Sequence, residues 1–174
     1  EKVMVFNAVY DVQFTEEVTT EPLTDNEVKN WLRLSSDTDL ELAKLTAKSA
    51  RIILERFTNT SIIRRKVKAT INNSLGDILL PYCPYVSGLV VKDSEGNTLT
   101  DVKTFGVEFV NLSSHNEDLL TVEYQAGYTS SNLPNVFKDA LKQQLAYMWE
   151  NRGDETVGIV NIAKQTLSPF RKVM

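Results

Sequence analysis

Few side chains in this sequence are of the types that carry out catalysis. The chain has one histidine, His115, within the polar run 113–118, and one cysteine, Cys83, between Tyr82 and Pro84. A serine–histidine or cysteine–histidine mechanism also needs an orienting partner and a positioned nucleophile, and the sequence contains no G-x-S-x-G. We therefore expect His115 to lie in an exposed loop and Cys83 to pack as a small apolar side chain.

Paired carboxylates are the next candidates for acid–base or metal chemistry. None of the pairs has the spacing of an EF-hand, no histidine cluster accompanies them, and no phosphate-binding glycine loop is present. Acidic residues at helix starts and in solvated loops explain the pairs without chemistry. We therefore predict no catalytic, metal or cofactor site, and no enzymatic activity. The pairs are Glu16/Glu17, Asp37/Asp39, Glu117/Asp118 and Asp154/Glu155.

The basic run 64–68 is the strongest candidate for contact with nucleic acid. Its alternation predicts a strand that exposes Arg64, Lys66 and Lys68 on one face and buries Val67 on the other. Three cations on one face can meet phosphates. No aromatic side chains are interleaved with them, as single-strand binders require. The alternative is a solvated strand face, or a face that forms ion pairs with acidic neighbours.

Length and composition limit the class of protein to which this chain can belong. A chain of 174 residues and 19.6 kDa has the length of one domain. With 42% apolar and 24% charged residues it is ordinary for a globular protein. The longest apolar run, 145–149, is far shorter than the roughly 18 residues of a membrane span, and residues 1–10 do not resemble a secretory signal. We expect no association with membranes.

Charge is distributed in blocks along the chain. The net charge of −4 divides into −6 over residues 1–40, +6 over 41–68, −6 over 69–133 and +2 over 134–174. Blocks of alternating sign favour the docking of charged surfaces, including copies of the chain on one another. The isoelectric point near 5.1 argues against a dedicated DNA-binding domain.

Two helices are expected before the basic run. Thr24 and Glu27 have the spacing of a capping box, which predicts a helix over 24–34 with Trp31 directed inward. The same spacing recurs from Thr38 and predicts a second helix with a stripe of small residues on its buried face. That stripe comprises Ala43, Ala47, Ala50, Leu54 and Phe57.

The middle of the chain is predicted to be mainly antiparallel β structure. After the basic run, short segments rich in Val, Thr, Tyr and Phe are separated by turn residues. Apolar alternation at Tyr10, Val12 and Phe14 also predicts an extended segment near the start. The expected strands of the middle region are 78–80, 86–92, 99–103, 107–111 and 119–125.

A long helix is expected after the β region. Pro134 suits its first turn and Gly153 its end, with Phe137, Leu141 and Leu145 on one stripe. A short helix over 157–164 is expected beyond it, and the last residues show no evident partner within the chain.

Together these elements predict one domain of the α+β class. Two N-terminal helices within 24–58 and one long C-terminal helix at 134–152 form a helical core. A mainly antiparallel β insertion at 61–128 lies between them, preceded by an extended segment 1–23 and followed by an extended C-terminal arm, 153–174.

Four stretches, in this order, resemble one protein family. Residues 21–34 (EPLTDNEVKNWLRL) look like an opening helix of the form EP-[VL]-T-x-x-E-[VA]-K-x-x-L-R, and 79–87 (LLPYCPYVS) look like LP-x-x-P-V-x-S. Residues 121–128 (TVEYQAGY), with LP at 133–134 and ENR at 150–152, are similar to V-x-Y-x-A-G-Y … [VL]-P … E-N-R. The stretch 167–171 (LSPFR) is similar to L-x-P-[YF]-R. The family is that of the head–tail connector (adaptor) proteins of long-tailed double-stranded DNA bacteriophages, although residues 1–20 are longer than its usual lead-in.

The resemblance implies a structural role in the virion. It implies a ring of about twelve copies at the head–tail junction, assembled in the host cytoplasm, which joins the portal protein to a tail-side stopper or tail-completion protein. DNA would pass through the ring without sequence-specific recognition. The alternatives are a nucleic-acid-binding module that uses strand 64–68 and a small hydrolase.

Two sets of residues would serve the structural role. Arg64, Lys66 and Lys68 are candidate contacts to DNA or to a neighbouring subunit. The C-terminal end offers an aromatic anchor with charged groups for the portal protein. The portal-interface candidates are Leu167, Pro169, Phe170, Arg171 and Lys172.

Overall fold

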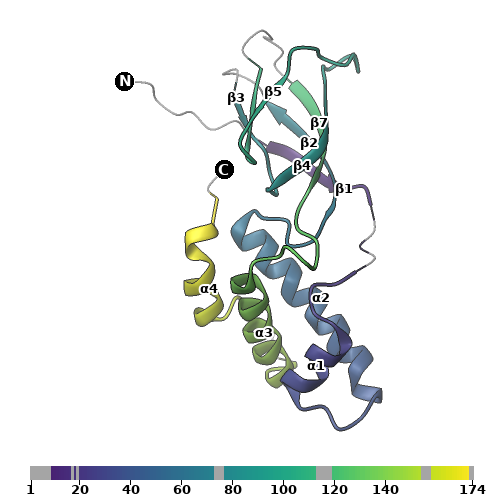
Figure 1. Ribbon diagram of the computed structural model, residues 1–174, viewed down its shortest axis with the longest axis vertical. Coiled ribbons are helices and arrows are strands. Elements are labelled where there is room, and N and C mark those ends of the chain that lie inside the picture. The colour runs from purple at the N-terminus through teal and green to yellow at the C-terminus, as the bar shows by residue number, and fades with distance from the viewer. Residues whose placement is uncertain are drawn as a thin grey trace. The chain divides into compact units, whose positions relative to one another are not determined.

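The described part of the computed structural model comprises residues 9–16, 18, 20–72, 77–112, 119–153 and 158–172. The chain divides into two compact units. The helical unit comprises residues 19–63 and 129–172, and the β unit comprises 1–18, 64–128 and 173–174. The predicted α+β class is confirmed, because the described residues form both helices and antiparallel sheets; one strand precedes the first helix, and the other strands lie between the second and third helices (Figure 1).

Within the described residues, four α-helices form the helical unit. Helix α2 packs against α3, α3 packs against α4, and α1 contacts both α2 and α3. The helices are α1 (Asp25–Leu32), α2 (Thr38–Thr58), α3 (Asn135–Glu150) and α4 (Asn161–Leu167), followed by the short 3-10 helix η1 (Ser168–Phe170).

Local sequence explains the start of α1 but not that of α2. The Thr24 hydroxyl accepts from the Glu27 N–H at 3.2 Å, and the Glu27 carboxylate accepts from the Thr24 N–H at 2.9 Å, as the capping box predicts. The second predicted capping box is wrong. Thr38 is the first helical residue of α2 rather than its cap, because its N–H donates to the Ser36 hydroxyl at 3.0 Å. The cap residue, Asp37, makes no side-chain capping bond.

The predicted small-residue stripe on α2 forms the centre of the helical unit. Ala43, Ala50 and Leu54 are fully buried, and small side chains allow a facing helix to approach closely. Trp31 differs from the prediction, since it is 42% exposed and directs only its indole N–H to the Lys142 carbonyl, at 2.7 Å. The side chains of α3 that are buried are Phe137, Ala140, Leu141, Gln144 and Leu145.

The described strands of the β unit form two antiparallel sheets. Its core is formed by inward side chains of both sheets, with Val67, Ile71, Val110 and Val122 among them. The four-stranded sheet has the order β1 (Val9–Phe14), β2 (Arg65–Asn72), β7 (Leu119–Ala126) and β4 (Tyr85–Lys92). The three-stranded sheet has the order β3 (Asp77–Leu79), β6 (Phe109–Asn111) and β5 (Lys103–Phe105).

Strand predictions were accurate where alternation was strong. The buried and exposed positions of β2 alternate as predicted. The strand expected at 99–103 is wrong, because β5 begins only at Lys103 and Thr98 makes an isolated bridge to Lys92. Segment 99–102 lies beyond a turn in which the Asp93 carboxylate accepts backbone N–H groups from Glu95 and Asn97.

The C-terminal arm is not extended over residues 161–170. Helix α4 overlaps the predicted short helix, and Ala163 and Leu167, one turn apart, are both buried. The approach to α4 is held by buried Gln144, whose amide donates to the Gly158 carbonyl at 2.9 Å and accepts from the Val160 N–H at 2.8 Å. Packing against α3 therefore overrides the extended conformation that was expected.

Candidate interaction surfaces

The basic strand places its cations as the alternation predicts. Lys66 is exposed and Lys68 half-buried on the outward side of β2, and Arg64 is exposed just before the strand begins. The Lys68 ammonium lies 3.4 Å from the Glu123 carboxylate on β7, and the Lys92 ammonium on β4 lies 3.9 Å from the same carboxylate. This face is therefore of mixed charge, as the alternative interpretation of the basic run proposed.

Arg65 is the cation of the run that turns inward. It is 5% exposed, and its guanidinium carbon lies 3.4 Å from the centre of the Phe14 ring and 5.9 Å from that of Tyr82. The two rings meet edge to face at 4.9 Å. A cation over aromatic faces is stabilised by their quadrupoles, so Arg65 fastens β1 to β2 and is unavailable to phosphate.

The C-terminal segment has partners within the chain, so the expectation that it lacks them is wrong. Leu167 is fully buried, whereas Phe170 is 37% exposed with its ring centre 5.1 Å from that of Phe137. Arg171 lies over the Phe57 ring at 5.3 Å. Pro169 is exposed.

The end of the segment is joined to the end of α2. The Lys172 N–H donates to the Thr58 carbonyl at 3.1 Å, and its carbonyl accepts from the Asn59 amide at 2.7 Å. Asn59 is the residue after α2 and has a left-handed backbone, with φ of 52°. Of the five portal-interface candidates, Leu167 belongs to the core of the helical unit and the other four lie at or near its surface.

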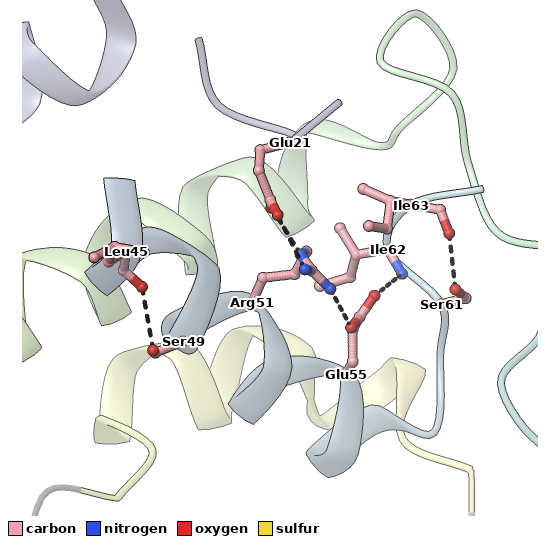
Figure 2. A network of polar contacts seen from close by, with 8 residues as sticks. All are labelled: Glu21, Leu45, Ser49, Arg51, Glu55, Ser61, Ile62 and Ile63. Carbon is pink, nitrogen blue, oxygen red and sulfur yellow. Dashed lines mark hydrogen bonds and ion pairs between the residues drawn. The ribbon is translucent and has the colours of Figure 1, made fainter. Parts of the chain in front are cut away.

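A buried ionic network fixes the end of α2 that receives this segment. Arg51 lies between Glu21 and Glu55 (Figure 2), with its Nε and Nη2 atoms 2.7 and 3.0 Å from the Glu21 carboxylate and Nη1 2.8 Å from that of Glu55. The second Glu55 oxygen accepts the Ile62 N–H at 2.9 Å. Burial alone would lower the pKa of Arg51, but hydrogen bonds and charges from Glu21 and Glu55 outweigh it and raise that pKa. The network thus joins the segment before α1, through Glu21, to α2 and to the turn that follows α2.

Of the groups that could carry chemistry, Glu16, Asp37 and Asp39 are exposed, and the others are buried or lie outside the described residues. Cys83 is fully buried and its thiol donates to the Leu80 carbonyl at 3.1 Å, as expected of a small core side chain. His115 and the pairs Glu117/Asp118 and Asp154/Glu155 fall outside the described residues, as does Glu17. Over the described residues no group of three or more His, Cys, Asp or Glu could hold a metal ion. No described helix has the length and hydropathy needed to cross a membrane.

The sequence analysis did not predict the buried ionic network or the docking of the C-terminal segment. The ionic network was signalled only by the four-residue spacing of Arg51 and Glu55 on α2, and the role of Glu21 depends on tertiary structure. The docking of Phe170 and Arg171 had no local signal, because their partners lie on α3 and α2.

Comparison with known proteins identifies the fold. No protein-family profile matches the sequence, and no curated protein matches it. Among solved structures, a chain in the neck of the empty gene transfer agent particle, computed with C6 symmetry, matches with a TM-score of 0.77 and 17% identity, covering 95% of this chain and 97% of that one.

Two further structures agree over the same length. A chain of the native gene transfer agent virion matches with a TM-score of 0.74 and 17% identity, covering 94% of this chain and 96% of that one. A chain of the native particle's neck, computed with C12 symmetry, matches with a TM-score of 0.69 and 14% identity, covering 95% and 97%. Over nearly its whole length, the chain has the fold of a component of gene transfer agent necks.

Proposed function

We propose that this protein is a structural component of the head–tail junction of a phage-like particle, where copies of it form a ring. The observation that carries the proposal is the fold shared over about the full length of both chains with a component of a particle neck. The order of the four sequence stretches that resemble head–tail connectors supports it independently. The function is therefore association rather than turnover.

The copy number and the partners proposed here are those that the resemblance implies, and the symmetry of the similar necks supports a ring. One of the similar necks was computed with C12 symmetry and another with C6 symmetry, which agrees with about twelve copies in a closed ring. On one side the ring binds the portal protein, and on the other it binds a stopper or tail-completion protein. DNA passes through its centre, and the assembled ring resides in the virion after assembly in the host cytoplasm.

The portal contact is assigned to the surface-lying part of the C-terminal segment. Pro169, Phe170 and Arg171 are exposed while the segment is held to the helical unit by rings and backbone hydrogen bonds. An aromatic side chain with an adjacent arginine is the type of group that dominates protein interfaces. Leu167 supports the segment from the core instead of contacting the portal itself.

The exposed face of β2 is assigned to DNA or to a neighbouring subunit. Arg64 and Lys66 are exposed, whereas the charge of Lys68 is shared with Glu123. A few such cations per copy, repeated around a ring, would hold DNA weakly and without sequence preference.

Removing the last seven residues tests the portal assignment. A variant lacking 168–174 keeps buried Leu167 and should fold, with its circular dichroism unchanged, but should no longer cosediment with portal particles. Ile162→Ser is the matched control, since Ile162 is 50% exposed on α4 outside the segment. Undiminished portal binding by the folded truncated chain would refute the assignment.

A further inference from the structure

Helix α2 carries a second apolar stripe, on a side turned away from its buried one. Leu42, Leu45 and Ser49 are spaced three and four positions apart, so they line up along one side of the helix. Ala43 and Ala50 point toward the core and are fully buried. Helices α1 and α3 both contact α2, yet the two leucines remain 47% and 63% exposed. We call Leu42, Leu45 and Ser49 the outer stripe of α2.

The hydroxyl groups on and beside the outer stripe already have partners within the helix. The Ser49 hydroxyl donates to the Leu45 carbonyl at 3.1 Å (Figure 2), and the Thr46 hydroxyl donates to the Leu42 carbonyl at 2.9 Å. Covering the stripe therefore leaves neither hydroxyl without a hydrogen bond, which avoids the cost of burying an unpaired polar group. Ser49 is also small, so a facing helix can approach closely.

One edge of the outer stripe carries opposite charges at its two ends. Glu41 and Lys48, seven positions apart, lie along this edge, and both are exposed. Lys44 lies further round the helix, where its ammonium is 3.4 Å from the carboxylate of Asp25 and 3.1 Å from that of Glu41. The edge is therefore acidic at the first leucine and basic beside Ser49.

The other edge of the outer stripe has no single sign. Asp39 is exposed at the start of α2, and Thr46 further along this edge is uncharged. The end of α3 adds Glu150 and Arg152, which are exposed and of opposite charge. The charges that select a partner for the stripe are therefore those of the edge that carries Glu41.

The outer stripes of two copies match each other when their α2 helices run antiparallel. If Leu42 of each copy packs against Leu45 of the other, the two-fold axis passes midway between these positions, and Glu41 of each copy lies across from Lys48 of the other. In a parallel pair, each of these charges would face the uncharged side chains of Thr46 and Ile53 instead. A surface that matches itself about a two-fold axis is what an isologous contact requires.

We propose that two unassembled copies of the chain pair through antiparallel α2 helices, with the outer stripes in contact and two reciprocal ion pairs between Glu41 and Lys48. A two-fold contact joins two copies only, so it does not build the proposed ring. The pair is a form of the chain before assembly, and the inference thus goes beyond the proposed function. The contact spans only a few helical turns and belongs to the weak, reversible class, so the copies can separate when a ring forms.

Reversing the two charges one at a time tests the pairing. Glu41→Lys and Lys48→Glu each set like charges against one another twice in a pair of identical copies. Each variant alone should therefore dimerise about tenfold more weakly than wild type in analytical ultracentrifugation, and the difference should shrink as salt rises. Lys164→Glu makes the same charge change at an exposed position of α4 and is the matched control, which should dimerise like wild type.

Mixing the two charge variants tests the antiparallel arrangement. One copy with Glu41→Lys and one copy with Lys48→Glu regain both ion pairs, so the mixture should dimerise about as tightly as wild type. The double variant with both substitutions should also pair with itself. Single variants that pair as tightly as wild type, or a mixture that pairs no more tightly than either variant alone, would overturn the proposal.

Truncating the leucines tests the apolar part of the contact. Leu42→Ser with Leu45→Ser changes only exposed positions, so circular dichroism should be unchanged while dimerisation weakens by about 100-fold. Ile162→Ser, at a position of α4 that is 50% exposed, is the control and should pair normally. A wild-type chain that stays monomeric up to about 1 mM, or that forms larger rings without a species of two copies, would overturn the proposal.

Failure of this inference is distinct from failure of the proposed function. A wild-type chain that never pairs in solution but still forms rings on portal particles would overturn the antiparallel pair and leave the proposed ring intact. A chain that pairs in solution but leaves portal particles bare would overturn the proposed ring and leave the antiparallel pair intact.

Discussion

Replacing Arg51 with methionine should destabilise the helical unit strongly. The substitution removes three hydrogen bonds of 2.7 to 3.0 Å and leaves the Glu55 carboxylate buried beside an apolar side chain. Glu21, whose side chain is 33% exposed, can regain water, but Glu55, at 2%, cannot. Removing one partner of a buried ion pair costs about 3–5 kcal/mol, a large part of the roughly 5–15 kcal/mol that stabilises a typical domain.

A second replacement separates charge from packing. In the double variant Arg51→Met with Glu55→Gln, no buried charge is left without a partner, and the glutamine carbonyl can still accept the Ile62 N–H that Glu55 accepts in the native chain. The double variant should therefore recover about 2 kcal/mol of the loss suffered by Arg51→Met alone. The stability regained in the double variant measures the free-energy cost of a buried Glu55 carboxylate without its arginine partner.

Tryptophan fluorescence during urea unfolding is the suitable assay. Both tryptophans, Trp31 and Trp149, belong to the helical unit, so the signal reports that unit even when the β unit unfolds separately. Lys44→Met, at an exposed ion pair, is the control and should leave the unfolding midpoint unchanged. A loss below about 1 kcal/mol for Arg51→Met, or a double variant less stable than the single one, would show that Glu55 does not need Arg51 to stay ionised in the core.

Three further predictions concern single side chains. The hydrogen bond from the Thr24 N–H is the largest cause of the lowered pKa of Glu27, and desolvation by burial opposes it. The stability that Glu27 contributes is therefore present above its pKa in the unfolded chain and is lost as the pH falls through its pKa in the folded chain. The difference in stability between wild type and Glu27→Gln should shrink between about pH 6 and 3. Tyr124→Phe removes the hydroxyl that donates to the Pro81 carbonyl in the core of the β unit, and should cost about 1–2 kcal/mol in urea unfolding followed by circular dichroism; an unchanged midpoint would contradict the assignment. Leu54→Ala, at a fully buried position of α2, should cost about 2–5 kcal/mol by the fluorescence assay, and a smaller loss would show that the neighbouring side chains collapse into the cavity.

Local signals in the sequence predicted local structure. The capping box at Thr24 and the alternation of β2 depend on residues within a few positions of one another, and both predictions are confirmed. The same capping rule failed at Thr38, because the nearby Ser36 hydroxyl takes up its N–H. A motif of two residues cannot distinguish these outcomes.

Contacts between distant segments could not be predicted from the sequence. The alignment of Phe109 with Leu79 and Phe105 depends on the register of three strands, and a shift of β6 by one residue would turn Phe109 inward and Val110 outward. The docking of Phe170 depends equally on Phe137, which is 33 positions earlier in the chain. Neither the alignment of Phe109 nor the docking of Phe170 could therefore be predicted without the strand register and the helix packing of the folded chain.

Electron microscopy of the purified chain mixed with portal particles is the decisive test of whether copies of the chain form a ring on the portal. We expect a closed ring of about twelve copies on one end of the portal, coaxial with its channel. Portal particles that remain bare at saturating concentrations of the intact chain would contradict it.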